Sequence, residues 1–128
     1  MCNQREYRDY KKRMLSGSTD GRGILVAATA SPGTLLHTAL SSVSGNEWDE
    51  VWLRVTNSSA SAVQLTIEFG GTTSPNDQIK ITVPAQSGLT DVVLGHVLQN
   101  GAIARAFAAT ANVLIVHGFV NRYENTDR

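Results

Sequence analysis

The sequence predicts an all-β protein: an antiparallel β-sandwich of about eight strands, preceded by an extended N-terminal arm. Three observations lead to this prediction. Apolar and polar residues alternate with a period of two between residues 50 and 83, as they do on half-buried strands. Turn residues interrupt this pattern at short, regular intervals. The 128 residues are enough to bury one hydrophobic core and too few for two.

Eight apolar or alternating runs follow one another from residue 24 onward. We expect strands at 24–30, 34–40, 50–56, 63–69, 78–83, 89–94, 103–108 and 112–120. Clusters of Gly, Pro, Ser and Asn separate these runs, and such residues supply the backbone conformations that turns need. Short strands with this spacing are typical of a jelly-roll-like or immunoglobulin-like sandwich. Apart from the N-terminal segment, the best candidate for a helical turn is at 95–99.

Two of the predicted strands have unusual faces. The run at 112–120 is apolar on both sides, which predicts either a central strand or a strand that contributes to an interface. The run at 103–108 presents a flat face made only of alanines, Ala104, Ala106 and Ala108. The interior of the sandwich is the preferred place for that alanine face, and a subunit contact is the alternative.

Residues 1–23 are predicted to form a basic arm beside a sandwich domain at 24–128. Six basic and three acidic residues give the arm a net charge of +3, and the remainder carries −3. Residues 3–15 could form a short amphipathic helix on a partner or a solvated tail. The Gly/Ser-rich stretch 16–23 predicts a flexible linker, so deleting residues 1–20 should leave the sandwich folded. The candidate partner-binding residues of the arm are Tyr7, Tyr10, Arg13 and Met14.

Charge, hydropathy and cysteine content disfavour several classes of function. Eleven basic and eleven acidic residues balance, so no overall field draws the chain to nucleic acid. No apolar run is long enough to span a membrane, and we expect no signal peptide. The lone Cys2 excludes an intrachain disulfide and a multi-cysteine metal site, and it fits a reducing compartment. We expect no membrane partner, no cofactor and no metal.

The candidate catalytic groups are scattered along the sequence. His37, His96 and His117 lie on different predicted elements without the spacing of a metal clamp, and the two on strands are expected to be structural. Ser87 lies in a turn between two strands, unlike the serine of a nucleophile elbow. The acidic cluster within 47–50 predicts a solvated entry to a strand rather than a calcium loop. We therefore expect no enzymatic activity, which disfavours a small hydrolase.

Two tryptophans are the remaining candidates for a binding site. Trp48 and Trp52 lie four residues apart, so they could share one face of a strand. Exposed tryptophans can stack against sugar rings, as in carbohydrate-binding modules. A contact between subunits would use the same residues.

The order of several segments resembles small β-sandwich structural proteins of tailed bacteriophage particles. The segments are GTLLHTA at 33–39, WDEVWL at 48–53, LTIEFGG at 65–71, VPAQSG at 83–88, ARAFA at 104–108 and HGFVNR at 117–122. The resemblance is to capsid decoration or cement proteins and related head or tail accessory proteins. It implies a symmetric oligomer that clamps neighbouring shell subunits, often with an extended terminal arm, and it implies no catalytic residues.

The sequence thus predicts a non-enzymatic structural protein of the virion, assembled in the host cytoplasm. Its expected partners are other copies of itself, with a trimer slightly favoured over a dimer, and the major capsid protein or another virion protein. Binding to nucleic acid is not expected. The alternative function is a carbohydrate-binding module or receptor-binding tip that uses Trp48 and Trp52.

Overall fold

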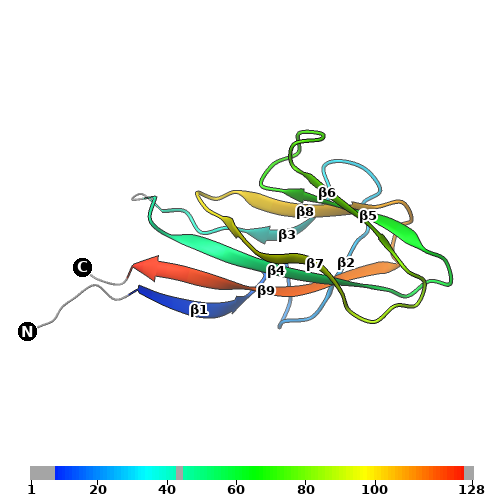
Figure 1. Cartoon of the computed structure of the whole chain (residues 1–128), viewed down its shortest axis with the longest axis horizontal. Helices are drawn as coiled ribbons and strands as arrows, with labels where there is room; N and C mark the ends of the chain where they lie inside the picture. The colour runs from blue at the N-terminus through cyan, green and yellow to red at the C-terminus, as the bar shows by residue number, and fades with distance from the viewer. Residues whose placement is uncertain (1–7, 43–44, 126–128) are drawn as a thin grey trace, which may run out of the picture.

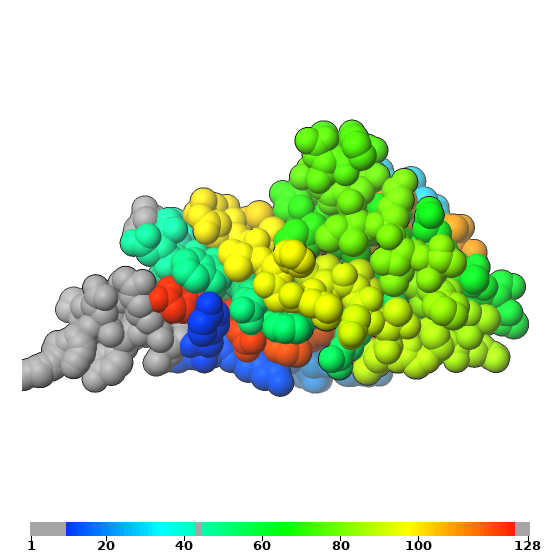
Figure 2. Space-filling view, viewed as in Figure 1, coloured from blue at the N-terminus to red at the C-terminus, as the bar shows by residue number. Residues whose placement is uncertain are grey.

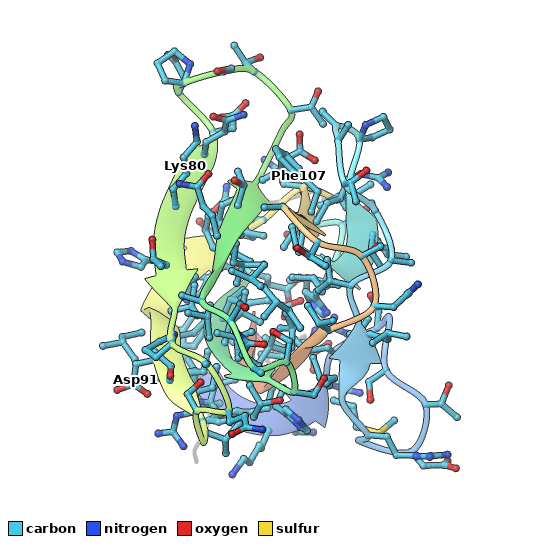
Figure 3. The ribbon with its side chains drawn as sticks, turned by 90° about the vertical axis from the view of Figure 1, so that its right-hand side faces the viewer. Lys80, Asp91 and Phe107 are labelled. Atoms are coloured by element: carbon cyan, nitrogen blue, oxygen red, sulfur yellow. The ribbon has the colours of Figure 1, made fainter. Side chains whose placement is uncertain are left out.

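The computed structural model describes residues 8–42 and 45–125, and within these ranges it is entirely β. Two antiparallel sheets pack face to face with side chains filling the space between them (Figures 1 and 3). The predicted all-β sandwich is therefore confirmed. The strands are β1 (Arg8–Met14), β2 (Ile24–Leu25), β3 (Thr34–Thr38), β4 (Trp48–Asn57), β5 (Val63–Phe69), β6 (Gln78–Val83), β7 (Thr90–Leu98), β8 (Ile103–Ala108) and β9 (Leu114–Asn125).

Seven of the eight strands predicted from the sequence are present, the strand predicted at 24–30 is confirmed only at Ile24–Leu25, and one strand, β1, was missed. The strand β7 continues to Leu98, so the helical turn expected at 95–99 is wrong. A bulge accommodates this extension. Gly95 has no partner on β4 in the pairing of these two strands. Its φ of +78° is a backbone conformation that glycine adopts readily.

The larger sheet, called sheet A here, has the strand order β1-β9-β4-β7, and β2 pairs with the other half of the same edge of β9. The smaller sheet, sheet B, has the order β3-β8-β5-β6. The doubly apolar strand β9 is central, between β1 and β4 (Figure 1). Of the two alternatives predicted for this strand, which is apolar on both sides, the central position is therefore correct.

The core consists of the facing inner surfaces of the two sheets. Leu53 on β4, Leu65 on β5 and Leu114 on β9 are completely buried. The three alanines of β8 are also buried, at 0–1% exposure, which confirms that their flat face belongs to the interior. Small side chains in sheet B leave room for the larger aliphatic side chains that face them from sheet A.

The N-terminal segment differs from the predicted arm. Residues 8–14 are not helical but form β1, which pairs antiparallel with β9 along the edge of sheet A (Figure 1). Leu15, which follows, is only 1% exposed and belongs to the hydrophobic core. The segment was misread because an edge strand can carry many charges, which protect its free side from pairing with another chain.

The stretch 16–23 is a packed bridge, so the prediction of a flexible linker is wrong. The Ser16 amide donates to Nδ1 of His37 at 2.9 Å, and the Gly17 amide donates to the carbonyl of Leu36 at 2.9 Å. A β-carbon on Gly17 would lie 2.7 Å from the carbonyl oxygen of Leu35. This glycine therefore allows the close approach of two backbones. The bridge ties the edge of sheet A to β3 of sheet B, and no separate arm precedes residue 24 in the described part of the chain.

Candidate functional site

A buried polar cluster joins the two sheets at one end of the sandwich. Asp49 on β4 is fully buried, and its carboxylate accepts two hydrogen bonds from the guanidinium of Arg122 on β9, at 2.8 and 3.0 Å. Nε2 of His37 on β3 lies 2.7 Å from Oδ2 of Asp49. The Leu40 amide donates to the same oxygen at 3.3 Å. The expectation that the acids at 47–50 form a solvated strand entry is therefore wrong for Asp49.

The hydrogen bonds of this cluster determine its protonation. Burial alone would raise the pKa of Asp49, but the hydrogen bonds from His37 and Arg122, together with the charge of Arg122, outweigh burial and hold that pKa well below its usual range. The hydrogen bond to Asp49 raises the pKa of Arg122. Because the Ser16 amide can only donate, Nδ1 of His37 must be the acceptor, so the proton of the neutral ring lies on Nε2 and points to Asp49.

The same geometry leaves the cluster without a group free for acid–base chemistry. Both ring nitrogens of His37 are occupied, and the ring is 1% exposed. The side-chain oxygen of Ser16 accepts from the Thr38 amide at 2.7 Å and is not bonded to the ring. His37 is therefore a structural histidine, as predicted. Its two hydrogen bonds join β3 of sheet B to the bridge 16–23 and to β4 of sheet A.

A second buried carboxylate, on sheet B, also holds a loop. Glu68 on β5 is 0% exposed and accepts hydrogen bonds from the hydroxyl of Ser31 and, at 2.7 Å, from the amide of Gly33. The Arg105 guanidinium donates to the carbonyl of Gly33 at 3.3 Å. Glu68 and Arg105 thus fix the turn that leads into β3, which gives them a structural role.

The other candidate chemical groups are not brought together. Over residues 8–42 and 45–125, no three His, Cys, Asp or Glu side chains lie close enough to hold a metal ion. His96 packs edge-on against Phe69, with 6.3 Å between ring centroids, whereas His117 lies on the opposite side of sheet A. Ser87 remains in the turn between β6 and β7. Cys2 lies outside the described residues.

The feature that stands out is the side of sheet A that faces away from sheet B, called the outer face here. Five of the eight aromatic residues of the chain lie on it, and the pairing register arranges its side chains in five rows that cross the strands. In order along β4, these rows are Tyr10, Tyr123 and Trp48; then Lys12, Asn121, Glu50 and Val97; then Met14, Phe119, Trp52 and Leu94; then His117, Arg54 and Asp91; then Leu25, Ile115 and Thr56. The third of them is called the central row below.

The aromatic rings of the outer face stack on one another across the strands. Trp48 lies nearly parallel to Tyr123, with ring centroids 4.4 Å apart, and Tyr10 leans on the other side of Tyr123 at 5.1 Å. Trp52 stacks on Phe119 at 6.1 Å and 9°. Such contacts orient the rings, and they bury Tyr123, which is 9% exposed, between its two neighbours. They also occupy one face of each tryptophan with a neighbour in the same chain.

Polar side chains fix these rings further. Oε1 of Glu50 accepts hydrogen bonds from the indole of Trp52 at 2.9 Å and from the amide of Asn121 at 3.0 Å. The ammonium of Lys12 lies 4.3 Å from the centre of the Phe119 ring, a cation–π contact. The outer face therefore has an ordered arrangement before any partner binds.

Much of the apolar surface of the outer face remains exposed. Tyr10, Met14 and Leu94 are each 52–53% exposed, and Val97 is 47% exposed. A groove of about 420 Å³ runs over this face, and its lining includes Trp52, Phe119, Leu94, Leu89, Arg54, His117 and Asn121. The space-filling view shows β1 (blue), β9 (orange-red), β4 (teal-green) and β7 (yellow-green) along the lower part of the molecule (Figure 2). Exposed apolar side chains gathered on one face mark a site of interaction.

The outer face contains most of the residues predicted as binding sites. Trp48 and Trp52 share this face, as expected from their spacing, and Tyr10 and Met14 join them through β1. Arg13 points the other way and pairs with Glu124 at 3.6 Å. Tyr7 lies outside the described residues.

Sequence reasoning did not find three members of the face, Phe119, Tyr123 and Leu94. Their place depends on the pairing register between strands that are far apart in the sequence. The one signal available was the apolar second side of β9, which is where Phe119 lies.

Comparisons with protein-family models, with curated protein sequences and with solved structures gave no match to this chain. In the described part of the chain, no helix could cross a membrane. The functional conclusion therefore depends on the geometry of the outer face and on the resemblance noted in the sequence.

Proposed function

We propose that this chain is a non-enzymatic structural protein of a virion, of the capsid decoration or cement type, and that it docks through the outer face of sheet A. The observation that carries this proposal is the concentration on that one face of five aromatic residues and of four further exposed apolar side chains, Met14, Leu25, Leu94 and Val97. Aromatic residues that are oriented before binding are the usual anchors of protein interfaces.

Three of the four edge strands support docking through a face rather than through an edge. β1 carries four basic residues, Arg8, Lys11, Lys12 and Arg13, and two register shifts interrupt the pairing of β7 with β4. Charges and bulges both discourage the addition of another strand. The edge at β3 is bonded to the bridge 16–23, through Gly17 and Ser16. The most exposed apolar surface thus belongs to a face.

The mechanism is mechanical. A small face gives a weak contact, but a shell presents the same contact many times, and linked contacts raise the overall affinity without new interactions. The buried Asp49 and Glu68 clusters keep the sandwich rigid, so little conformational entropy is lost on docking. The assignment to a virion, and its localisation there, come from the resemblance to phage decoration proteins.

The direct test is to purify virus particles from a culture whose viral genome carries this gene and to look for the chain in them by mass spectrometry. Particles from which it has been stripped should rebind the wild-type protein. The Leu94→Asp variant, on the outer face, should fail to rebind. The Leu35→Asp variant is the matched control, because Leu35 is exposed on β3 of sheet B. Particles that lack the chain, or that bind both variants equally, contradict the proposal.

The second candidate function is sugar binding at the same face. It is favoured by the groove, which combines the rings of Trp52 and Phe119 with the polar side chains of Arg54, His117 and Asn121. Against it, Trp48 and Trp52 each stack on a ring of the same chain, which leaves less flat surface for a sugar. A glycan array separates the two functions, because the docking proposal predicts no specific signal.

A further inference from the structure

The outer face of sheet A has a pattern that complements itself. We propose that it packs against the same face of a second copy of this chain. The two copies are related by a two-fold axis that lies between the two faces and directly above the central row. This inference rests on the proposed function, since it names the partner of the same docking surface as a second copy of the chain, held by a neighbouring shell subunit. The axis runs across the strands, so β4 lies over β4 of the other copy and β9 over its β9, with the strands antiparallel.

Two oppositely charged side chains on β4 lie symmetrically about Trp52. Glu50 and Arg54 lie two residues before and two residues after Trp52, on the same face of the strand. An axis at Trp52 places Glu50 of each copy opposite Arg54 of the other. Opposite charges that meet twice in this way fix the register of a contact.

The side chain of Arg54 has donors to spare for this contact. Its Nε donates to Asp91 at 2.9 Å, and the two side chains are 55% and 57% exposed. A guanidinium has five N–H donors, so a second carboxylate can bind without displacing the first.

The neighbouring strand β9 has the same symmetry. Asn121 and His117 lie two residues on either side of Phe119, so the axis sets the amide of one copy opposite the imidazole of the other. These two groups can form a hydrogen bond. The ends of the central row, Met14 and Leu94, are each 53% exposed and would meet their own copies. Two of the most exposed apolar side chains of the face therefore lie along the axis.

A two-fold axis parallel to the strands fits less well. It would lay β9 over β4 of the other copy, with Arg54 opposite His117 and Lys12 opposite Val97. That arrangement pairs no opposite charges. A trimer, which the sequence alone slightly favours, has no such two-fold contact, so the pattern about Trp52 favours a dimer.

The expected dimer is weak. Between Cα positions the five rows span about 15 by 27 Å, from the spacing of strands and of alternate residues. Counted on both copies, this area is below about 1,000 Å², which is smaller than stable specific interfaces and typical of weak, transient contacts. Sedimentation velocity of the wild-type chain should therefore be followed up to about 1 mM, where even an association free energy of about 4 kcal/mol is visible. A monomer at every concentration overturns the inference.

A charge exchange tests the contact itself. Glu50→Arg and Arg54→Glu each place like charges opposite one another, so each should weaken the dimer by about tenfold or more. The double variant Glu50→Arg/Arg54→Glu restores opposite charges and should recover the dimer. A merely structural role of either residue would give no recovery, and its absence contradicts the contact. The matched control is Lys80→Glu on β6 of sheet B, which should not change dimerisation (Figure 3).

Cross-linking tests the direction of the axis. In a Cys2→Ser background, Leu94→Cys should cross-link to its own copy through a bismaleimide that spans about 10 Å, the distance between packed sheets. An axis along the strands would instead bring Leu94 over Met14, and the single variant would not cross-link.

The particle test separates this inference from the proposed function. If the wild type is monomeric while Leu94→Asp fails to bind particles, the outer face docks on another protein and only the dimer is refuted. If the wild type dimerises as described while Leu94→Asp still binds particles, the dimer stands and the proposed docking surface is wrong. Far-ultraviolet circular dichroism verifies that each variant is folded.

Discussion

Replacing Asp49 by Asn should destabilise the sandwich strongly. The carboxylate accepts four hydrogen bonds, from Nε2 of His37, from two nitrogens of Arg122 and from the Leu40 amide. The Asn side chain has a similar size, but its NH₂ group would face one of these donors. It also leaves the Arg122 guanidinium, which is only 20% exposed, without its counter-charge.

The size of the effect follows from burial. Removing one partner of a buried ion pair costs about 3–5 kcal/mol. For a chain of this length, this lowers the melting temperature by roughly 12–20 °C, at about 4 °C per kcal/mol. Asp91→Asn is the matched control, because Asp91 also pairs with an arginine but is 57% exposed. Exposed pairs contribute about 0–1 kcal/mol, so the control should melt within a few degrees of the wild type.

The assay is urea unfolding of the wild type and both variants at neutral pH, followed by circular dichroism. If the slope of the free energy of unfolding against urea concentration is unchanged and the midpoint is lower for Asp49→Asn, the stability has changed and the cooperativity of unfolding has not. Equal midpoints for the two variants would refute the reasoning, because they would show that burial does not distinguish the two ion pairs.

Three further predictions follow from the packing. The pKa of folded Asp49 is depressed, so its contribution to the free energy of unfolding is present above the ordinary aspartate pKa and is lost as the pH falls below about 4. Between pH 7 and pH 2, the urea midpoint should therefore fall less steeply for Asp49→Asn than for the wild type. Gly17→Ala should cost about 1–3 kcal/mol through the clash of its β-carbon with two carbonyl oxygens, measured by urea unfolding, and an unchanged midpoint would mean that the bridge 16–23 is loose. Deleting residues 1–20 should prevent stable folding, since it removes β1 and the buried Leu15; a truncated chain that melts like the wild type would restore the flexible-linker interpretation.

The sandwich could be predicted because most strands have a clear period of two. The alternation in β4 reports directly which side of the strand is buried, whereas Thr66 and Glu68, on the polar side of β5, are buried as well. β1 could not be found in this way, because its charged residues resemble a solvated segment and its pairing with β9 is a contact between opposite ends of the chain. The role of Gly17 was hidden for a related reason: glycine in a close backbone contact looks the same as glycine in a linker.

The candidate site was predictable only in part. The spacing of Trp48 and Trp52 placed them on one face of a strand, since side chains an even number of positions apart point the same way. Their partners Tyr123 and Phe119 are more than 60 positions away in sequence, and the register that aligns them is set by the whole of β9. Asp49 was misjudged because its partners, His37 and Arg122, lie on two other strands.

The most direct test of the docking surface uses the intrinsic fluorescence of the protein. The chain has two tryptophans, Trp48 and Trp52, and both lie on the outer face of sheet A, so their emission reports on that surface without any substitution. Emission and acrylamide quenching should be compared between the dilute protein and the protein bound to particles or concentrated until it associates. We predict a shift of the emission to shorter wavelength and a clear loss of quenching in the associated forms. Association that leaves both the emission and the quenching unchanged would contradict the assignment of this face.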